Sequence, residues 1–201
     1  MTRQLTTQDL RRALTGITAR LIDCTEELNT LDAALGDADL GGTLASISKS
    51  VQKEIETLPD DLGEALLRVV KAFSRTSGSS FSGVVMAGVM RAGMRLRGRD
   101  ALNADELPAL LRECVTTMSE RGGAKLGDKS LLDGIAAIAT ALEGGGGDLA
   151  AEADRAVASA LDAFRDQPSK IGRARLAGER SIGRDDPGMV ALKRMMEGLK
   201  N

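Results

Sequence analysis

Apolar residues recur with a helical spacing along most of this chain. In the first segment, from Leu10 to Leu35, an apolar residue returns every three or four positions and forms one continuous stripe. Thr6 or Thr7 can cap the start of this helix, and Asp9 in its first turn suits the helix dipole. The pattern therefore predicts one long, packed helix at the beginning of the chain.

Seven further segments have a helical pattern, and no alternating pattern is long enough to predict a strand with conviction. Asn103 and Glu106 form a candidate capping box at the start of one segment. The predicted helices cover about residues 43–57, 61–73, 84–96, 103–121, 130–143, 148–166 and 190–199. We therefore predict an all-α fold of eight helices, with residues 1–201 as a single domain.

The segments between the helices are rich in glycine. Residues 122–130 are predicted as a glycine-broken loop, and residues 144–147 as a four-glycine turn between helices. The connection 168–187 is longer than usual for a compact domain, where such long loops commonly have a function. Its five basic side chains suggest an anion clamp, although a solvated basic loop is the commoner interpretation of such a segment alone. These side chains are Lys170, Arg173, Arg175, Arg180 and Arg184.

Three aspartates lie within eight residues at the end of the first predicted helix. The stretch reads LDAALGDADLGGT from Leu31 to Thr43 and contains Asp32, Asp37 and Asp39. Carboxylates this close repel one another unless a cation lies among them, and Mg²⁺ prefers oxygen ligands that it shares with phosphate. Gly41–Gly42 allows the backbone to approach a ligand closely. The stretch predicts a metal–phosphate site, with a solvated helix end as the alternative.

Composition narrows the chemistry further. The net charge of −2 gives no sign of a nucleic-acid or anionic-membrane partner. The chain has no histidine, which excludes a histidine base, a histidine-ligated metal and a phosphohistidine on this chain, and it has no tryptophan or tyrosine for base stacking. Cys24 and Cys114 fit apolar helical registers, so we expect core residues in a reducing cytoplasm. We see no signal peptide and no apolar run of about 18 residues that would span a membrane.

Four motifs occur in order along the chain: LDAALGDADLGG, SGSSFSG, GGAKLGDKSLLDG and GRARLAGERSIGRDDPG. Together they resemble the nucleotide-binding subunit or C-terminal domain of dihydroxyacetone kinases. The likeness covers essentially the whole chain. At 201 residues the chain resembles the free-standing subunit, without the substrate-binding domain that some relatives carry fused to it.

The resemblance implies an antiparallel eight-helix barrel that binds ADP or ATP with two Mg²⁺ ions at one end. It implies that Asp32, Asp37 and Asp39 bind the metal, that Ser82 offers its hydroxyl to a phosphate, and that Arg173 is a basic contact. Two interpretations of Asp128 and Lys129 stay open: they are part of the active rim, or they form a surface pair. The implied nucleotide contacts are Leu40, Gly41, Gly42, Thr43, Phe81, Ser82, Gly122, Leu131, Arg173, Asp186, Pro187 and Gly188.

The implied reaction is phosphoryl transfer from the Mg-nucleotide to a short keto sugar. Positioning and charge neutralisation would drive it, with no catalytic residue on this chain beyond the metal and phosphate ligands. In the family, a histidine of a separate substrate-binding subunit holds dihydroxyacetone as a hemiaminal, which agrees with the missing histidines here. We therefore expect that subunit as a partner, and a homodimer of this chain. Whether ATP exchanges, or bound ADP is rephosphorylated by a phosphotransfer protein, is left open.

The chain departs from the family pattern at several loop positions. Leu40 and Thr43 stand where histidine and asparagine are usual, and Ser79, Ser80 and Phe81 change the serine loop. These changes leave a tetrulose as an alternative substrate, and a non-catalytic Mg-nucleotide-bound regulatory module as an alternative function. A helical barrel that carries an apolar ligand is a third interpretation, based only on the leucine- and methionine-rich interior.

Overall fold

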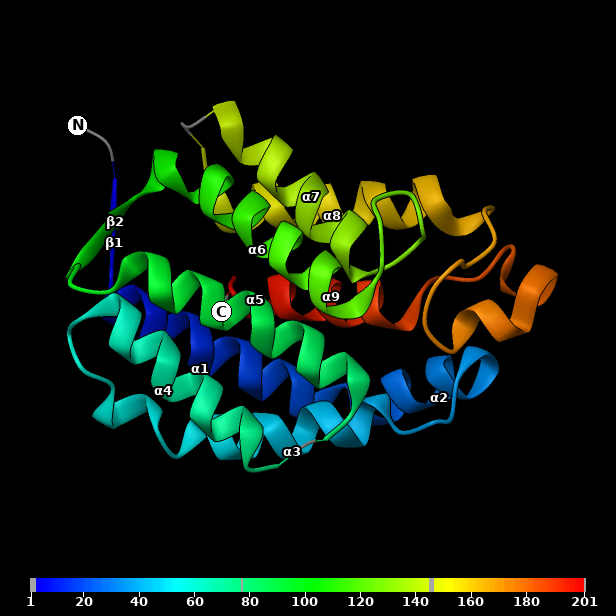
Figure 1. Cartoon of the computed structure of the whole chain (residues 1–201), viewed down its shortest axis with the longest axis horizontal. Coiled ribbons are helices and arrows are strands. Elements are labelled where there is room, and N and C mark those ends of the chain that lie inside the picture. The colour runs from blue at the N-terminus through cyan, green and yellow to red at the C-terminus, as the bar shows by residue number, and fades with distance from the viewer. Residues whose placement is uncertain (1–2, 77, 145–146, 201) are drawn as a thin grey trace.

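The computed structural model describes residues 3–76, 78–144 and 147–200, and most of them are helical (Figure 1). The all-α prediction is confirmed. The predicted four-glycine turn falls partly on residues 145–146, which lie outside the described residues. The α-helices of the described chain are α1 (Thr7–Asp23), α2 (Thr25–Leu35), α3 (Leu40–Gln52), α4 (Leu62–Ser74), α5 (Ser80–Leu96), α6 (Leu107–Gly122), α7 (Leu131–Ala141), α8 (Leu149–Arg165) and α9 (Pro187–Gly198).

The first predicted helix is broken in two at Cys24. Cys24 ends α1 and precedes α2, with φ −95° and ψ 17°. The hydroxyl of the next residue, Thr25, donates a hydrogen bond to the carbonyl oxygen of Ile22 at 2.7 Å. Cys24 is nevertheless a buried core residue, as predicted, and so is Cys114. With α1 and α2 taken together as one bent element, the eight predicted segments are all present.

A short β-ribbon is the element that the sequence did not reveal. Strands β1 (Gln4–Thr6) and β2 (Ala101–Asn103) pair antiparallel, with Leu5 opposite Leu102. Three residues are too few to produce a recognisable alternation. The capping box of Asn103 and Glu106 is present, but it starts the 3₁₀ turn η2 (Ala104–Glu106), which precedes α6.

Three further 3₁₀ segments in the described chain occupy places that were predicted differently. One of them, η3 (Leu142–Gly144), directly follows α7. The second predicted helix ends at Gln52, and η1 (Ile55–Thr57) follows it as a separate turn. The long connection contains η4 (Ala174–Ser181), which is interrupted at Gly178, where φ is 55°. The connection therefore has local structure of its own.

The helices form a closed antiparallel ring. Each one packs against the next along the chain, and α9 closes the ring by packing against α1. At that last contact Gly16 and Gly198 meet backbone to backbone, so neither position has room for a side chain. The largest apolar core lies inside the ring and includes Leu28, Val157 and Met189. The expected antiparallel barrel is confirmed.

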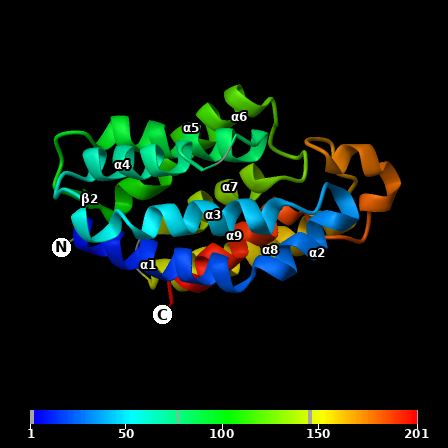
Figure 2. The same ribbon diagram turned by 90° about the horizontal axis from the view of Figure 1, so that it is seen from below.

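The antiparallel order places four helix starts at one end. Figures 1 and 2 show that α3, α5, α7 and α9 begin at the end where α2 finishes and where η4 lies. Helix N-termini carry partial positive charge and unpaired N–H groups, which favour anions. Among the described residues, no helix is both long and apolar enough to cross a membrane.

Candidate metal and nucleotide site

The three aspartates of the first motif come together in space. Asp32 lies in the last turn of α2, and Asp37 and Asp39 lie in the loop that leads into α3. One carboxylate oxygen from each lies within 4.8 Å of the others, and Asp37 and Asp39 are exposed to solvent. The sequence spacing alone could not decide whether the three side chains converge, so this convergence is the central structural observation of the site.

Asp32 organises the loop that carries the other two carboxylates. Its Oδ2 accepts hydrogen bonds from the backbone N–H groups of Asp39 at 3.0 Å and Leu40 at 3.4 Å. A Cβ at Gly36 would lie 2.2 Å from Asp32 Oδ1, so a larger residue there would displace the Asp32 carboxylate. Ala38 takes the left-handed conformation, with φ 65°, which is uncommon for a residue with a side chain. These contacts fix a tight turn whose carboxylates face one another.

The segment that follows the aspartates is the first turn of α3, and its members face different ways. Leu40 and Gly41 are buried, and a Cβ at Gly41 would meet the carbonyl oxygen of Thr25. Gly42 is exposed, with open space where a Cβ would stand, and its N–H donates to Asn29 Oδ1 at 3.1 Å. Thr43 is half-buried. The side chain of Leu40 therefore belongs to the core, and the accessible part of this segment is the backbone around Gly42.

Arg173 reaches the aspartate cluster from the long connection. It immediately precedes η4, and its guanidinium forms an ion pair with the carboxylate of Asp37. The Arg173 side chain is 63% exposed. Of the basic residues in this connection, Arg173 is the one whose ion pair joins it to the cluster. The long connection is thus part of the candidate site.

A second group of predicted residues gathers around the start of α9. A Cβ placed on Gly188 would lie 3.0 Å from Cε2 of Phe81 and 3.8 Å from Cβ of Leu131. Glycine therefore lets the Phe81 ring approach the α9 backbone. Pro187 and Leu131 are buried, and Phe81 is half-buried. Three sequence motifs, from α5, α7 and α9, meet here.

Asp186 caps α9 within this second group. Its Oδ1 accepts a hydrogen bond from the N–H of Met189 at 2.8 Å. Burial raises the pKa of Asp186 to about 6, and the hydrogen bond from Met189 and the charge of Lys129 only partly oppose this effect. Perturbed carboxylates of this kind occur often at functional sites, although they also occur in structural networks.

Ser82 and Gly122 have structural contacts of their own, and the nucleotide contacts expected of them stay predictions. Ser82 is only 1% exposed, because α5 begins at Ser80 and not at Val84. Its hydroxyl donates to the carbonyl oxygen of Ser79 at 2.8 Å, and Ser79 is the N-cap of α5. Gly122 is the last residue of α6, and a Cβ there would lie 2.7 Å from Val84. Ser82 is therefore a helix-start residue in the interior, and Gly122 provides close packing of α6 on α5.

Sequence reasoning missed the burial of Lys129. The side chain is 1% exposed, and its ammonium donates to the carbonyl oxygens of Arg165, Gln167 and Ser181. The surface-pair interpretation of Asp128 and Lys129 is wrong, because Lys129 points inward and Asp128 instead accepts from the N–H of Lys125 at 2.7 Å. A lysine next to glycines gives no sequence signal for burial, since its partners are distant backbone carbonyls.

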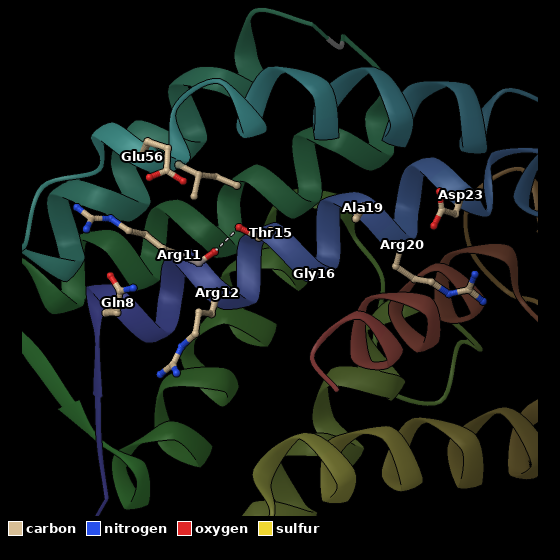
Figure 3. A pocket seen from close by; sticks show the side chains of 10 residues that line it. Gln8, Arg11, Arg12, Thr15, Gly16, Ala19, Arg20, Asp23 and Glu56 are labelled. Atoms are coloured by element: carbon tan, nitrogen blue, oxygen red, sulfur yellow. Dashed lines mark hydrogen bonds between the residues drawn. The ribbon is translucent and has the colours of Figure 1, made fainter. Parts of the chain in front are cut away.

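A surface hollow lies away from the residues predicted for the site. It measures about 500 Å³, runs along α1 beside η1, and contains none of the predicted site residues (Figure 3). Its arginines already have partners: Arg11 pairs with Asp60, Arg12 with Asp9, and Arg20 with Glu197. A groove with matched charges offers little to attract an anion. We therefore place the candidate site at the aspartate cluster.

Comparison with known proteins assigns the family. The model of the DAK2 domain matches residues 34–201, which include the aspartates Asp37 and Asp39 and all of η4 and α9. The chain belongs to the DAK2-domain family. The resemblance inferred from the four motifs is thereby confirmed. Because this match begins inside α2, most of the first predicted helix lies outside it.

Two relatives illustrate the range of this DAK2 family. The chain is 31% identical to a D-erythrulose kinase of Mycolicibacterium smegmatis over 90% of its own length, but it spans only 33% of that kinase. It is 29% identical to the ADP-binding subunit DhaL of the PEP-dependent dihydroxyacetone kinase of Escherichia coli, covering 87% of this chain and 86% of the relative. The DAK2 chain is therefore similar in extent to a separate subunit and to one part of longer kinases.

Solved structures support the same fold. The dihydroxyacetone kinase of Citrobacter freundii matches with a TM-score of 0.77 at 24% identity, over 94% of this chain and 34% of that protein. The same kinase in complex with AMP-PNP and Mg²⁺ matches with a TM-score of 0.76 at 23% identity, over 99% and 34%. At this identity the likeness establishes the helical architecture of the DAK2 chain.

Proposed function

We propose that this chain is the nucleotide-binding subunit of a keto-sugar kinase. The observation that carries the proposal is the convergence of Asp32, Asp37 and Asp39 at the end of the barrel where four helices begin. Relatives that are named as kinases, including an ADP-binding subunit, support the same conclusion. The chain would act as a phosphotransferase only together with a partner that binds the sugar.

The aspartate cluster suits Mg²⁺. Two oxygens on one Mg²⁺ ion lie at most about 4.2 Å apart, because each bond is about 2.1 Å long. Oxygens within 4.8 Å of one another therefore reach one ion after small side-chain rotations, or are shared between two ions. All the donors are carboxylates. Mg²⁺ prefers such oxygen ligands, whereas softer metals prefer sulfur and imidazole nitrogen. When bound, the metal would supply charge neutralisation on the phosphate oxygens.

The remaining predicted residues divide into a phosphate side and a base side. On the phosphate side, the backbone around Gly41–Thr43 would approach the phosphates, and Arg173 would add positive charge next to Asp37. On the base side, Phe81, Leu131 and Gly188 would provide apolar contact, and Asp186 and Pro187 would shape the closing turn. Ser82 and Leu40 would contribute through their backbone, since both side chains are buried.

The substrate and the phosphoryl source belong to partners of this chain. We propose that a separate subunit holds the sugar through its own histidine, because this chain has none. Dihydroxyacetone is the first candidate sugar. Erythrulose is the second, because two relatives are a D-erythrulose kinase and an L-erythrulose 1-kinase. Rephosphorylation of bound ADP by a phosphotransfer protein is part of the proposal, because three relatives are subunits of PEP-dependent kinases. A homodimer of this chain is proposed as well.

Calorimetric titration of Mg-ADP and of Mg-ATP into the purified chain tests nucleotide binding. We expect saturable binding that Asp37→Asn weakens at least about tenfold, equivalent to about 1.4 kcal/mol. Asp60→Asn is the matched control, because Asp60 is 93% exposed and pairs with Arg11, away from the cluster. Wild-type binding weaker than about 1 mM would remove the nucleotide-subunit proposal.

Turnover with the partner subunit separates the finer alternatives. Activity with ATP alone indicates exchange, whereas activity only with the phosphoenolpyruvate relay indicates a retained ADP. The preferred sugar among dihydroxyacetone and the two erythruloses follows from the same assay. If a cellular role of the chain persists in Asp37→Asn after nucleotide binding is lost, the non-catalytic regulatory module becomes the better description.

A further inference from the structure

Lys129 joins the two ends of the long connection. Its ammonium donates to the carbonyl oxygens of Arg165 at 2.9 Å, Gln167 at 2.8 Å and Ser181 at 2.8 Å. An ammonium group has three N–H donors, so these three bonds use all of them. Arg165 ends α8, and Ser181 ends η4. One buried side chain from the loop between α6 and α7 therefore binds both the beginning and the end of the segment 166–183.

Other hydrogen bonds hold together the two ends of the segment 166–183, which we call the base of this loop. The N–H of Ser169 donates to Ser181 Oγ at 2.9 Å, and Ser181 Oγ donates to the carbonyl oxygen of Gly178 at 2.6 Å. The N–H of Gly183 donates to the carbonyl oxygen of Arg165 at 2.9 Å. Ser181 is fully buried. The segment 166–183 is thus a loop with a polar, buried base, and Lys129 is the charged group at its centre.

The outer part of this loop is largely exposed, although Ile171 packs against the core. Leu176 is 77% exposed, and Arg175 and Gly178 are also exposed, whereas Ala174 is the buried apolar residue of η4. Arg173 lies in this outer part and reaches Asp37. A loop with few buried apolar contacts depends on its hydrogen bonds for a fixed conformation. The base that Lys129 holds therefore contributes to the placement of Arg173, together with Lys170, which donates to the carbonyl oxygens of Asp128 and Gly127.

We propose that Lys129 is a positioning residue, which holds the 166–183 loop so that Arg173 lies at the aspartate cluster. This inference rests on the proposed nucleotide site. Lys129 has no hydrogen bond to the cluster, and its positioning effect on the nucleotide passes through Arg173. Its charge also acts on Asp186, and the double-mutant cycle below separates the two routes. Removing the ammonium would take a donor from all three carbonyl oxygens. The carbonyl of Ser181 is buried and the carbonyl of Arg165 keeps the N–H of Gly183, so the loss at Ser181 most favours opening of the loop.

The test measures Mg-ADP affinity and loop accessibility in Lys129→Met, a neutral variant of similar length. We expect the affinity to fall about tenfold, and trypsin to cleave the loop at Arg173, Arg175 or Arg180 faster than in the wild type. Lys193→Met is the matched control, because Lys193 is also largely buried but pairs with Asp154 and Glu197. This control should lower the stability without changing the affinity more than about twofold.

A double-mutant cycle with Arg173→Ala separates positioning from general destabilisation. If Lys129 acts through Arg173, Lys129→Met causes no further loss of affinity in the Arg173→Ala background. Additive losses would overturn the inference, and so would an unchanged affinity in Lys129→Met. Failure of the wild type to bind Mg-ADP would instead overturn the proposed function, and the trypsin result would still decide whether Lys129 holds the loop.

A second variant covers the case in which Lys129→Met does not fold. Ser181→Ala removes the bonds of the Ser181 hydroxyl to the N–H of Ser169 and to the carbonyl oxygen of Gly178, but it keeps the Lys129 ammonium and its three acceptors. We expect faster tryptic cleavage in the loop and a smaller loss of Mg-ADP affinity. If Ser181→Ala leaves both cleavage and affinity unchanged, the base of the loop does not control Arg173 and the inference is overturned.

Discussion

Individual carboxylates in this molecule differ in their surroundings, and the differences decide their roles. Asp32 accepts two backbone N–H groups and shapes the turn, whereas Asp37 and Asp39 remain exposed. Asp186 is the carboxylate whose pKa burial raises to about 6. The first three are suited to share a cation, and the fourth is suited to cap a helix. Burial and hydrogen bonding therefore separate residues that look alike in the sequence.

The raised pKa of Asp186 predicts a pH-dependent stability. Its folded pKa of about 6 lies above the ordinary value of 3.8, so ionised Asp186 destabilises the fold above pH 6. This cost disappears as the pH falls from 6 to 4, where the carboxyl is protonated. We expect Asp186→Asn, which keeps an acceptor for Met189, to be about 1–3 kcal/mol more stable than the wild type at pH 8. Urea unfolding at pH 8, 6 and 4 measures the difference.

The difference between Asp186→Asn and the wild type should shrink toward zero at pH 4. Asp148→Asn is the control for the same change at another N-cap, since Asp148 is exposed and caps α8. A difference that is constant with pH, or that grows at low pH, would contradict the assignment of a raised pKa to Asp186.

At the scale of the elements, close packing depends on glycines at helix crossings. Gly16 of α1 and Gly198 of α9 touch through their backbones, and a Cβ on either would collide with the other helix. Gly83 of α5 differs, because a Cβ there would meet only the tip of Arg121 at 4.0 Å. The two kinds of helical glycine have the same intrinsic cost relative to alanine, about 1 kcal/mol. Any difference in stability between their alanine variants should therefore come from packing.

We expect Gly16→Ala to destabilise the protein by about 2–4 kcal/mol, because α1 and α9 must move apart. Gly83→Ala should instead stabilise it by about 0.5–1 kcal/mol, because helix propensity improves without a clash. Chemical denaturation of the two variants beside the wild type measures both effects. Equal changes in the free energy of unfolding, with the same sign, would show that the close contact of α1 with α9 does not exclude a side chain at Gly16.

The sequence predicted the helices well where an apolar stripe lies on one face. It failed at Cys24, because Leu21, Cys24 and Leu28 continue the apolar stripe through the break. It also failed for the ribbon β1–β2, whose strands pair across nearly a hundred residues. Periodicity describes one face of one element. Breaks and distant pairings depend on contacts that it does not contain.

The candidate site was predicted only in part for a similar reason. The residues of the aspartate cluster are close in sequence, so their spacing suggested a shared ligand. Gly188, Phe81 and Leu131 come from three motifs, and only the resemblance connected them before the structure placed them in contact. Lys129 was misjudged because its acceptors are backbone carbonyls, which every residue has. Side-chain chemistry is visible in a sequence, whereas burial against a distant backbone is not.

On the scale of the whole molecule, the last helix closes the ring. Glu197 of α9 accepts from Arg20 of α1 at 2.9 Å and from Lys193 at 3.0 Å, and it also pairs with Arg194. Lys193 in turn pairs with Asp154 of α8 at 2.6 Å. These side chains are 12–32% exposed, so they are screened less than surface pairs. The network thus joins α9 to both of its neighbours in the ring.

Closure of the ring by this network predicts a large effect for Glu197→Gln. Burial raises the pKa of Glu197, but Lys193, Arg20 and Arg194 lower it more, so the net shift is downward. Its stabilising contribution is therefore present above the ordinary value of 4.5 and is lost as the pH falls through the folded pKa. We expect Glu197→Gln to cost about 1–3 kcal/mol at pH 7, because three cations lose their shared partner.

Glu64→Gln, which breaks an exposed pair with Arg97, should cost less than about 1 kcal/mol. Urea unfolding at pH 7 and at pH 3 measures both variants, and the Glu197→Gln deficit should narrow at the lower pH. An equal, pH-independent cost for the two variants would mean that α9 is held to α1 and α8 by apolar packing alone.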